Sequence, residues 1–308
     1  MALAAPAVEV GLKRILVATD FSAPSNKAVQ FAAAVGRGYG AKVYLAHVVS
    51  ALGFTLAGPD ATCVAEEAAW RDLRLLEENL QRVGTLAGVS HEAIVCQGEV
   101  WEQLEQLVER EHVDLIVIGT HGRTGLRKVV MGSVAEQVFR HASCPVLTIG
   151  PAVPPEAPAV EQFRRILFPS DFGEVSRHAL SYAIALANRS RAKLILLHVL
   201  SAMPVVETGP YWYLANDVNQ RREIVRPAAM ERLRNLLPPG TRLSCPPEFE
   251  VAFDFPPEGI AATAAEQKAD LILMGVRTAS LATGSHIPWA VAHEVVCRAH
   301  CPVLTVRG

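Results

Sequence analysis

Short runs of apolar residues alternate along the chain with segments whose apolar residues recur every three or four positions. In the first half of the chain, the apolar runs fall at residues 15–18, 42–48, 92–96, 115–118 and 146–149. Continuous apolar runs bounded by turn residues are typical of strands that are buried on both faces of a parallel sheet. We therefore expect five parallel strands in this half.

The segments between these runs have the periodicity of amphipathic helices. This spacing predicts helices over residues 25–37 and roughly 65–84, and a third around Leu104, Leu107 and Val108. The alternation of strands and helices predicts an α/β fold, a doubly wound, Rossmann-like domain with helices on both faces of the sheet. Such domains bind ligands beyond the carboxyl ends of the strands, where the winding reverses.

The second half of the chain repeats the first. RILVATDFS at 14–22 returns as RILFPSDFG at 165–173, DLIVIG at 114–119 as DLILMG at 270–275, and SCPVLTI at 143–149 as HCPVLTV at 300–306. These matches keep their order, so the sequence predicts two tandem domains, 1–150 and 163–308. The proline-rich segment 151–162 between them is expected to be an extended linker.

The composition excludes several classes of protein. Of the 308 residues, 50% are hydrophobic and 19% are charged, so the chain can fill two cores and is not disordered. The net charge of −2 lacks the basic excess of proteins that bind nucleic acid or membrane surfaces. No apolar run approaches a membrane span, and the first ten residues lack the Lys or Arg of a signal peptide. The six cysteines are expected to be reduced and mostly buried, which predicts a cytoplasmic protein.

Polar and glycine residues follow three of the predicted strands. Thr19 and Asp20 follow the first strand, and Asp20 has two interpretations, contact with a ligand or capping of the next helix. His47 and Val48 end the second strand, and the histidine is interpreted as a satisfied core or rim residue. The fourth strand leads into a glycine-rich loop from Gly119 to the next helix.

This glycine-rich loop is the most informative segment of the chain. Ser133 and Glu136 have the spacing of a capping box, which predicts a helix that starts at Ser133. A helix start offers free N–H groups and a positive dipole end to a phosphate. Gly119, Gly122 and Gly132 would let the backbone approach a ligand without an intervening Cβ.

The loop and the other strand ends resemble the universal stress protein family. Its nucleotide-binding signature is Gly, two residues, Gly, nine residues, then Gly followed by Ser or Thr, which Gly119, Gly122, Gly132 and Ser133 match. The resemblance covers both copies and implies an adenine nucleotide alpha hydrolase-like fold and ATP binding by the first copy, with Mg²⁺. The residues that it implies are Thr19, Asp20, Val48, Gly119, His121, Gly122, Arg123, Gly132, Ser133 and Val134.

The second copy departs from this signature. Gly275 matches Gly119, but Thr278 replaces Gly122, and Pro288 or Trp289 falls at the position of Gly132. A proline or tryptophan would block the close backbone approach that glycine permits. We therefore expect one intact ATP site and one degenerate site.

The sequence favours binding over catalysis. It contains no GxxxxGK[ST], HExxH or GxSxG motif, and a metal site at His293, Cys297 and Cys301 is disfavoured because Cys301 repeats Cys144 at the start of a buried strand. The resemblance implies a nucleotide-dependent stress-response or signalling module with slow or no ATP hydrolysis.

Two alternatives stay open, a non-binding structural dimer or scaffold and an enzyme of the ATP-pyrophosphatase or electron-transfer-flavoprotein type. The latter is disfavoured because residues 18–22 do not match its SGGxDS-like loop.

The last strand of each copy is a candidate pairing element. In the family, this edge strand often adds to the sheet of a neighbour, which also covers an exposed edge. The expectation is that residues 146–149 and 303–306 pair the two domains with each other. A further pairing of two chains into a homodimer stays open.

Overall fold

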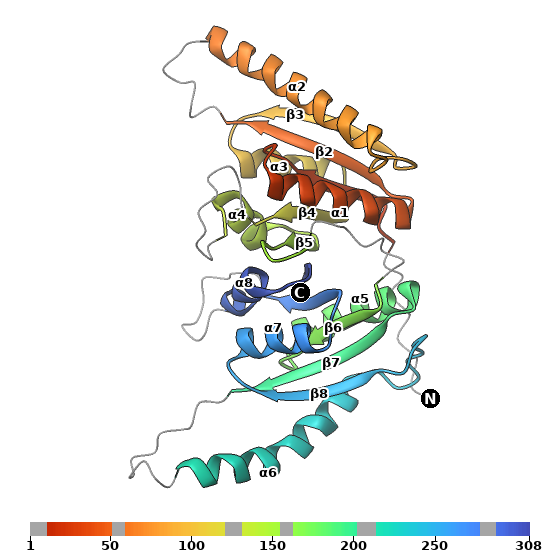
Figure 1. Ribbon diagram of the computed structural model, residues 1–308, viewed down its shortest axis with the longest axis vertical. Helices are drawn as coiled ribbons and strands as arrows, with labels where there is room; N and C mark the ends of the chain where they lie inside the picture. Colours follow the sequence, from red (N-terminus) through yellow and green to blue (C-terminus); the bar gives the residue numbers. More distant parts are fainter. Residues whose placement is uncertain (1–10, 51–58, 121–130, 155–162, 202–213, 278–287) are drawn as a thin grey trace.

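A computed structural model describes residues 11–50, 59–120, 131–154, 163–201, 214–277 and 288–308 (Figure 1). The elements of the first half are β1 (Arg14–Ala18), α1 (Ala23–Tyr39), β2 (Lys42–Val49), α2 (Pro59–Arg82), β3 (His91–Gln97), α3 (Val100–Arg110), β4 (Leu115–Gly119), α4 (Ser133–His141) and β5 (Val146–Ile149). Those of the second half are β6 (Arg165–Pro169), α5 (Glu174–Ser190), β7 (Lys193–Leu200), α6 (Leu214–Arg234), β8 (Glu248–Phe253), α7 (Pro256–Glu266), β9 (Leu271–Val276), α8 (Pro288–Arg298) and β10 (Val303–Arg307).

The strands form one ten-stranded sheet in the order β3-β2-β1-β4-β5-β10-β9-β6-β7-β8. Within each half, neighbouring strands pair in parallel, and the winding reverses between β1 and β4 and between β6 and β9. β5 and β10 pair antiparallel, with Leu304 opposite Leu147. The predicted doubly wound α/β fold with five parallel strands per copy is confirmed.

Helices cover both faces of the sheet because side chains alternate along each strand. On β1, Ile15 and Val17 face one core cluster with Phe31 of α1, whereas Leu16 faces the other cluster with Leu104 of α3. The second half uses α5 and α6 on the first face and α7 and α8 on the second. In Figure 1 the arrows of β2 and β7 both point to the left, so the carboxyl ends of these strands lie on one side of the molecule.

The cysteines are less buried than predicted. Cys297 and Cys301 are buried, Cys63 is exposed, and the other three are half-buried; all six are free thiols. The prediction of mostly buried cysteines was wrong because Cys63 lies on the outermost helix, α2, and Cys96 on the edge strand β3. Among the described residues, no group of His, Cys, Asp and Glu is arranged to hold a metal ion.

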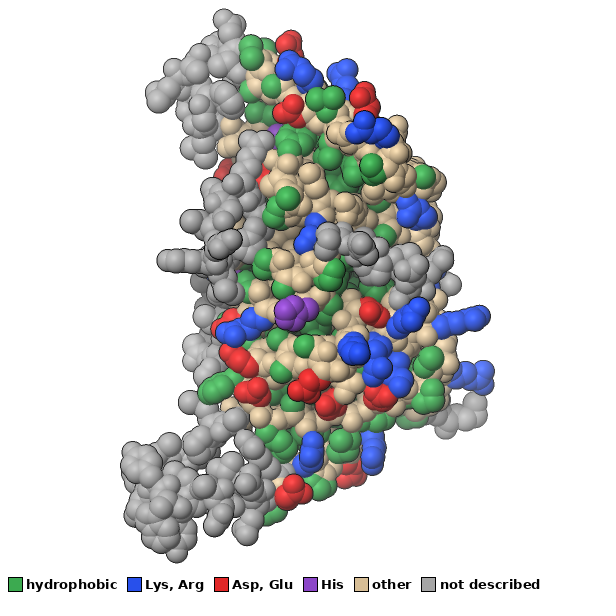
Figure 2. Space-filling model, viewed as in Figure 1, with side chains coloured by type: hydrophobic (Ala, Val, Ile, Leu, Met, Phe, Trp, Pro, Cys, Tyr) green, Lys and Arg blue, Asp and Glu red, His purple; other side chains and the backbone are tan. Residues whose placement is uncertain are grey.

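The described surface carries side chains of both charges. Acidic and basic groups intermingle on the face seen in Figure 2, with apolar side chains between them. The largest exposed apolar side chains on α2 and directly after it are those of Val64, Leu75 and Val83. None of the helices in the described part of the chain is long and apolar enough to cross a bilayer.

Candidate functional site

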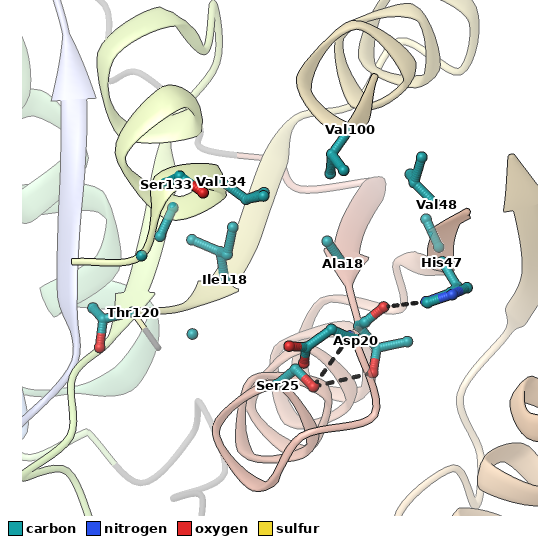
Figure 3. A pocket seen from close by; sticks show the side chains of 15 residues that line it. Ala18, Asp20, Ser25, His47, Val48, Val100, Ile118, Thr120, Ser133 and Val134 are labelled. Atoms are coloured by element: carbon teal, nitrogen blue, oxygen red, sulfur yellow. Dashed lines mark hydrogen bonds between the residues drawn. The ribbon is translucent and has the colours of Figure 1, made fainter. Parts of the chain in front are cut away.

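A cavity of about 220 Å³ lies at the carboxyl ends of β1, β2 and β4, where the winding of the first half reverses (Figure 3). Its wall comes from these strand ends and from the first residues of α1, α3 and α4. Seven of the ten residues implied by the family resemblance line it: Thr19, Asp20, Val48, Gly119, Gly132, Ser133 and Val134. The other three, His121, Gly122 and Arg123, lie outside the described residues.

The turn after β1 holds a phenylalanine in a conformation that is rare for a bulky residue. Phe21 has φ +64°, in the left-handed region. Its N–H donates to Thr19 Oγ1 at 3.1 Å, and its ring lies 4.4 Å from that of His47. His47 Nδ1 in turn donates to the Thr19 carbonyl oxygen at 2.7 Å. These contacts fix the turn, and with it the direction of Asp20.

Asp20 supports the start of α1 without capping the helix itself. Its Oδ1 accepts hydrogen bonds from Ser22 N at 3.1 Å and Ser22 Oγ at 2.5 Å. Ser22 is the N-cap, and its side chain accepts from the N–H of Ser25. The Oγ of Ser25 is buried and lies 3.2 Å from Thr19 Oγ1, so the side chains of Thr19, Asp20, Ser22 and Ser25 form one polar network at the cavity. Figure 3 shows two of its members, Asp20 and Ser25.

The start of α4 differs from the predicted capping box. The helix does begin at Ser133, but the N-cap is Gly132, and no side chain caps the helix. Glu136 does not bond to the backbone N–H of the N-cap residue; its Oε1 lies 2.6 Å from Arg140 Nη2 in an ion pair. Because the N-cap is a glycine, the first-turn N–H groups of Ser133, Val134 and Ala135 receive no capping side chain, and these residues line the cavity.

Gly119 is needed for the packing of β4 against the start of α1. A Cβ at this position would lie 2.8 Å from the carbonyl oxygen of Pro24, in the first turn of α1. Gly275 has the same constraint, with the carbonyl oxygen of Val175 at 2.7 Å. A shared glycine at these two positions therefore reflects the close contact between a strand end and a helix start.

A second cavity, of about 210 Å³, occupies the corresponding place in the second half. Its turn repeats the first: Phe172 has φ +64°, its N–H donates to Ser170 Oγ at 3.0 Å, and its ring lies 4.4 Å from His198. The repeated lining residues are Ser170, Asp171, Ser176, His198, Val199 and Gly275. The sequence interpretation singled out Ser170 and Asp171 but missed the two phenylalanines and the two helix-start serines.

Two ionisable groups of the second cavity are perturbed. Burial lowers the pKa of His198, and the charge of Arg232 acts in the same direction. Burial raises the pKa of Asp171, but hydrogen bonds from Ser176 and the Gly173 N–H, together with the charge of Arg277, bring it below its ordinary value. Both shifts favour a neutral histidine beside an ionised aspartate.

Comparison with known proteins identifies the family. The universal stress protein family profile matches residues 11–150 and 162–307, which is most of the chain. The chain belongs to the universal stress protein family.

Its relatives include single-domain and longer proteins. Universal stress protein MJ0531 of Methanocaldococcus jannaschii is 32% identical over 145 residues, covering 44% of this chain and 81% of that protein. A universal stress protein of Mycolicibacterium smegmatis is 27% identical over 227 residues, which cover 71% of this chain and 73% of that protein. The crystal structure of a universal stress protein from Archaeoglobus fulgidus has the same fold, with a TM-score of 0.65 over 96% of both chains at 21% identity.

Proposed function

We propose that this universal stress protein binds ATP, together with Mg²⁺, in the cavity of its first half. One observation carries the proposal: the Thr19–Asp20 turn and the uncapped start of α4 converge on the same cavity at the reversal of the winding. The turn supplies hydroxyl and carboxylate oxygens for a ribose. The helix start supplies N–H groups and a positive dipole end for phosphates.

The other implied residues extend this assignment. Val48, at the end of β2, would present its backbone to the adenine. Ser133 and Val134 would hold phosphate oxygens, and the loop residues His121, Gly122 and Arg123 belong to the same proposed phosphate site. Asp20 is the single carboxylate among the described lining residues, so Mg²⁺ would be held mainly by phosphate oxygens.

The proposed role is binding, with slow or no hydrolysis. In the described lining, Asp20 already accepts two hydrogen bonds from Ser22, and the Nδ1 of His47 is committed to the Thr19 carbonyl oxygen. Neither group is set up as a general base for an attacking water. We infer a cytoplasmic stress-response or signalling module, with domains 1–150 and 163–308 that pair with each other through β5 and β10.

The variant Gly132→Asp tests ATP binding with little risk to folding. Aspartate is a favourable N-cap, so α4 is expected to be as stable or more stable. Its carboxylate would repel a phosphate at the helix start, and ATP affinity should fall on the order of tenfold or more. The measurement is titration calorimetry with ATP and Mg²⁺ on protein freed of bound nucleotide.

The matched control is Gln81→Glu, which adds the same charge at an exposed position on α2. It should leave ATP affinity unchanged. If the wild-type protein binds no ATP, or if Gly132→Asp binds it as tightly as the control does, the nucleotide proposal fails. A non-binding scaffold is then the better interpretation.

A further inference from the structure

The second cavity keeps the part of the first that fits a nucleoside. It has nearly the same volume, the same strained turn and a serine hydroxyl and a carboxylate in the same places, Ser170 and Asp171. A left-handed backbone is strained for a phenylalanine and persists only where neighbouring groups hold it. The second half holds Phe172 in this conformation through the same backbone-to-hydroxyl bond and the same ring contact as the first half.

The side of the second cavity formed by the end of β9 and by α8 has changed in chemistry. Arg277 follows β9 and lines the cavity, at the position that corresponds to His121. The helix on this side, α8, begins at Pro288, whose nitrogen carries no hydrogen to donate. The described lining of the second cavity also carries a guanidinium group, that of Arg277, which the described lining of the first cavity lacks.

The guanidinium group of Arg277 is available to a ligand. Its Nη2 lies 3.9 Å from Asp171 Oδ2, and both side chains are more than half exposed, so the attraction between them is weak. The orientation of the Asp171 carboxylate does not depend on this ion pair. Its Oδ1 accepts hydrogen bonds from the Gly173 N–H at 2.8 Å and from Ser176 Oγ at 2.6 Å. Arg277 can therefore turn toward an anion while Asp171 keeps its place.

The remaining wall of the cavity is apolar. It is formed by Val199 at the end of β7, Ile260 of α7, Met274 of β9 and Val291 of α8. These residues come from both sides of the strand ends and would enclose a flat, weakly polar ring. The described lining thus combines an apolar wall, a carboxylate with a hydroxyl, and the positive charge of Arg277.

We propose that the second cavity binds a nucleoside monophosphate. The base lies against the apolar wall, the ribose hydroxyls donate to Asp171, and the single phosphate pairs with Arg277. A guanidinium group matches a phosphate bidentately and needs no metal ion. The nucleoside part of this assignment rests on the function proposed for the first cavity, whereas the phosphate part rests on Arg277 alone.

The test uses the full chain with phosphate binding in its first cavity weakened by Gly132→Asp. AMP, adenosine and ATP with Mg²⁺ are titrated into this variant and into the double variant Gly132→Asp/Arg277→Gln. We expect AMP to bind the single variant, and Arg277→Gln to weaken AMP roughly tenfold or more without changing its affinity for adenosine. A double variant with Arg74→Gln, an exposed arginine of α2, is the control and should bind AMP normally.

The outcomes separate the two proposals. Loss of AMP binding on Gly132→Asp alone would place AMP in the first cavity and overturn the inference. Equal affinity for AMP with and without Arg277 would also overturn it. If the wild-type chain binds no ATP but the Gly132→Asp variant binds AMP through Arg277, the inference stands and the function proposed for the first cavity fails.

Discussion

Two phenylalanines fix the geometry of the two cavities. Phe21 and Phe172 directly follow the aspartates, and their left-handed backbone turns the chain from strand to helix. The strain is offset by a hydrogen bond to the Thr or Ser hydroxyl two residues earlier and by contact with the tilted ring of a histidine. The aspartates are therefore held by their neighbours before any ligand arrives.

Removal of the α1 cap should be measurable as a loss of stability. Ser22→Ala deletes the oxygen that accepts from Ser25 N and the hydroxyl that donates to Asp20. We expect the free energy of unfolding to fall by about 1 kcal/mol in urea titrations. Ser143→Ala, at an exposed position, should change it by less than about 0.5 kcal/mol; an equal loss in both variants would argue against the capping role.

His198 should make stability depend on pH. Its folded pKa is lowered, chiefly by burial, so the unfolded chain binds this proton more readily. The free energy of unfolding should therefore fall as pH drops through about 6.5, the ordinary pKa of histidine. In His198→Asn, whose amide can still donate to the Ser170 carbonyl oxygen, the fall between pH 7.5 and 5.5 should be smaller. Identical pH profiles for the two proteins would contradict this assignment.

At the residue scale, the sequence predicts where the cavity lies but not how it is held. Thr19, Asp20 and Val48 could be placed because polar residues after buried strands collect at the sheet edge. Phe21 could not, since a phenylalanine next to a strand suggests core packing, and bulky residues rarely adopt a left-handed backbone. The predicted capping box does not form, because the N-cap is Gly132, which has no side chain, and Glu136 pairs with Arg140.

At the scale of elements, apolar runs located every strand of the first half, since buried parallel strands leave a continuous signal. Helix bounds were less accurate: α1 begins at Ala23 rather than at residue 25, because Ser22 caps it. The β5–β10 ladder depends on a contact between distant segments. Its register, Leu304 opposite Leu147, could not be derived from either strand alone.

The β5–β10 junction should contribute strongly to stability. Leu147 is 3% exposed and sits opposite Leu304 in the antiparallel ladder. Leu147→Ala is expected to lower the free energy of unfolding by about 2–5 kcal/mol, through lost burial and an unfilled cavity. The comparison is Leu75→Ala on α2, which is 51% exposed and should cost less than about 0.5 kcal/mol. A small effect at Leu147 would mean that the two halves do not depend on this contact.

For the whole molecule, the ladder joins strands of one chain, and this has a thermodynamic signature. An interface between separate chains makes the melting temperature rise with protein concentration, whereas an intramolecular one does not. We expect the same Tm at about 1 and 100 μM in calorimetric scans. A rising Tm would indicate that chains exchange these strands or associate through another surface.

Joining the halves in one polypeptide also changes how the protein can evolve. In a pair of identical chains, each mutation appears twice and alters both cavities at once. Here the two cavities are encoded separately, so Arg277 and Pro288 occur in one half while Gly132 and Ser133 stay in the other. The covalent link thus allows the two cavities of one molecule to differ in specificity.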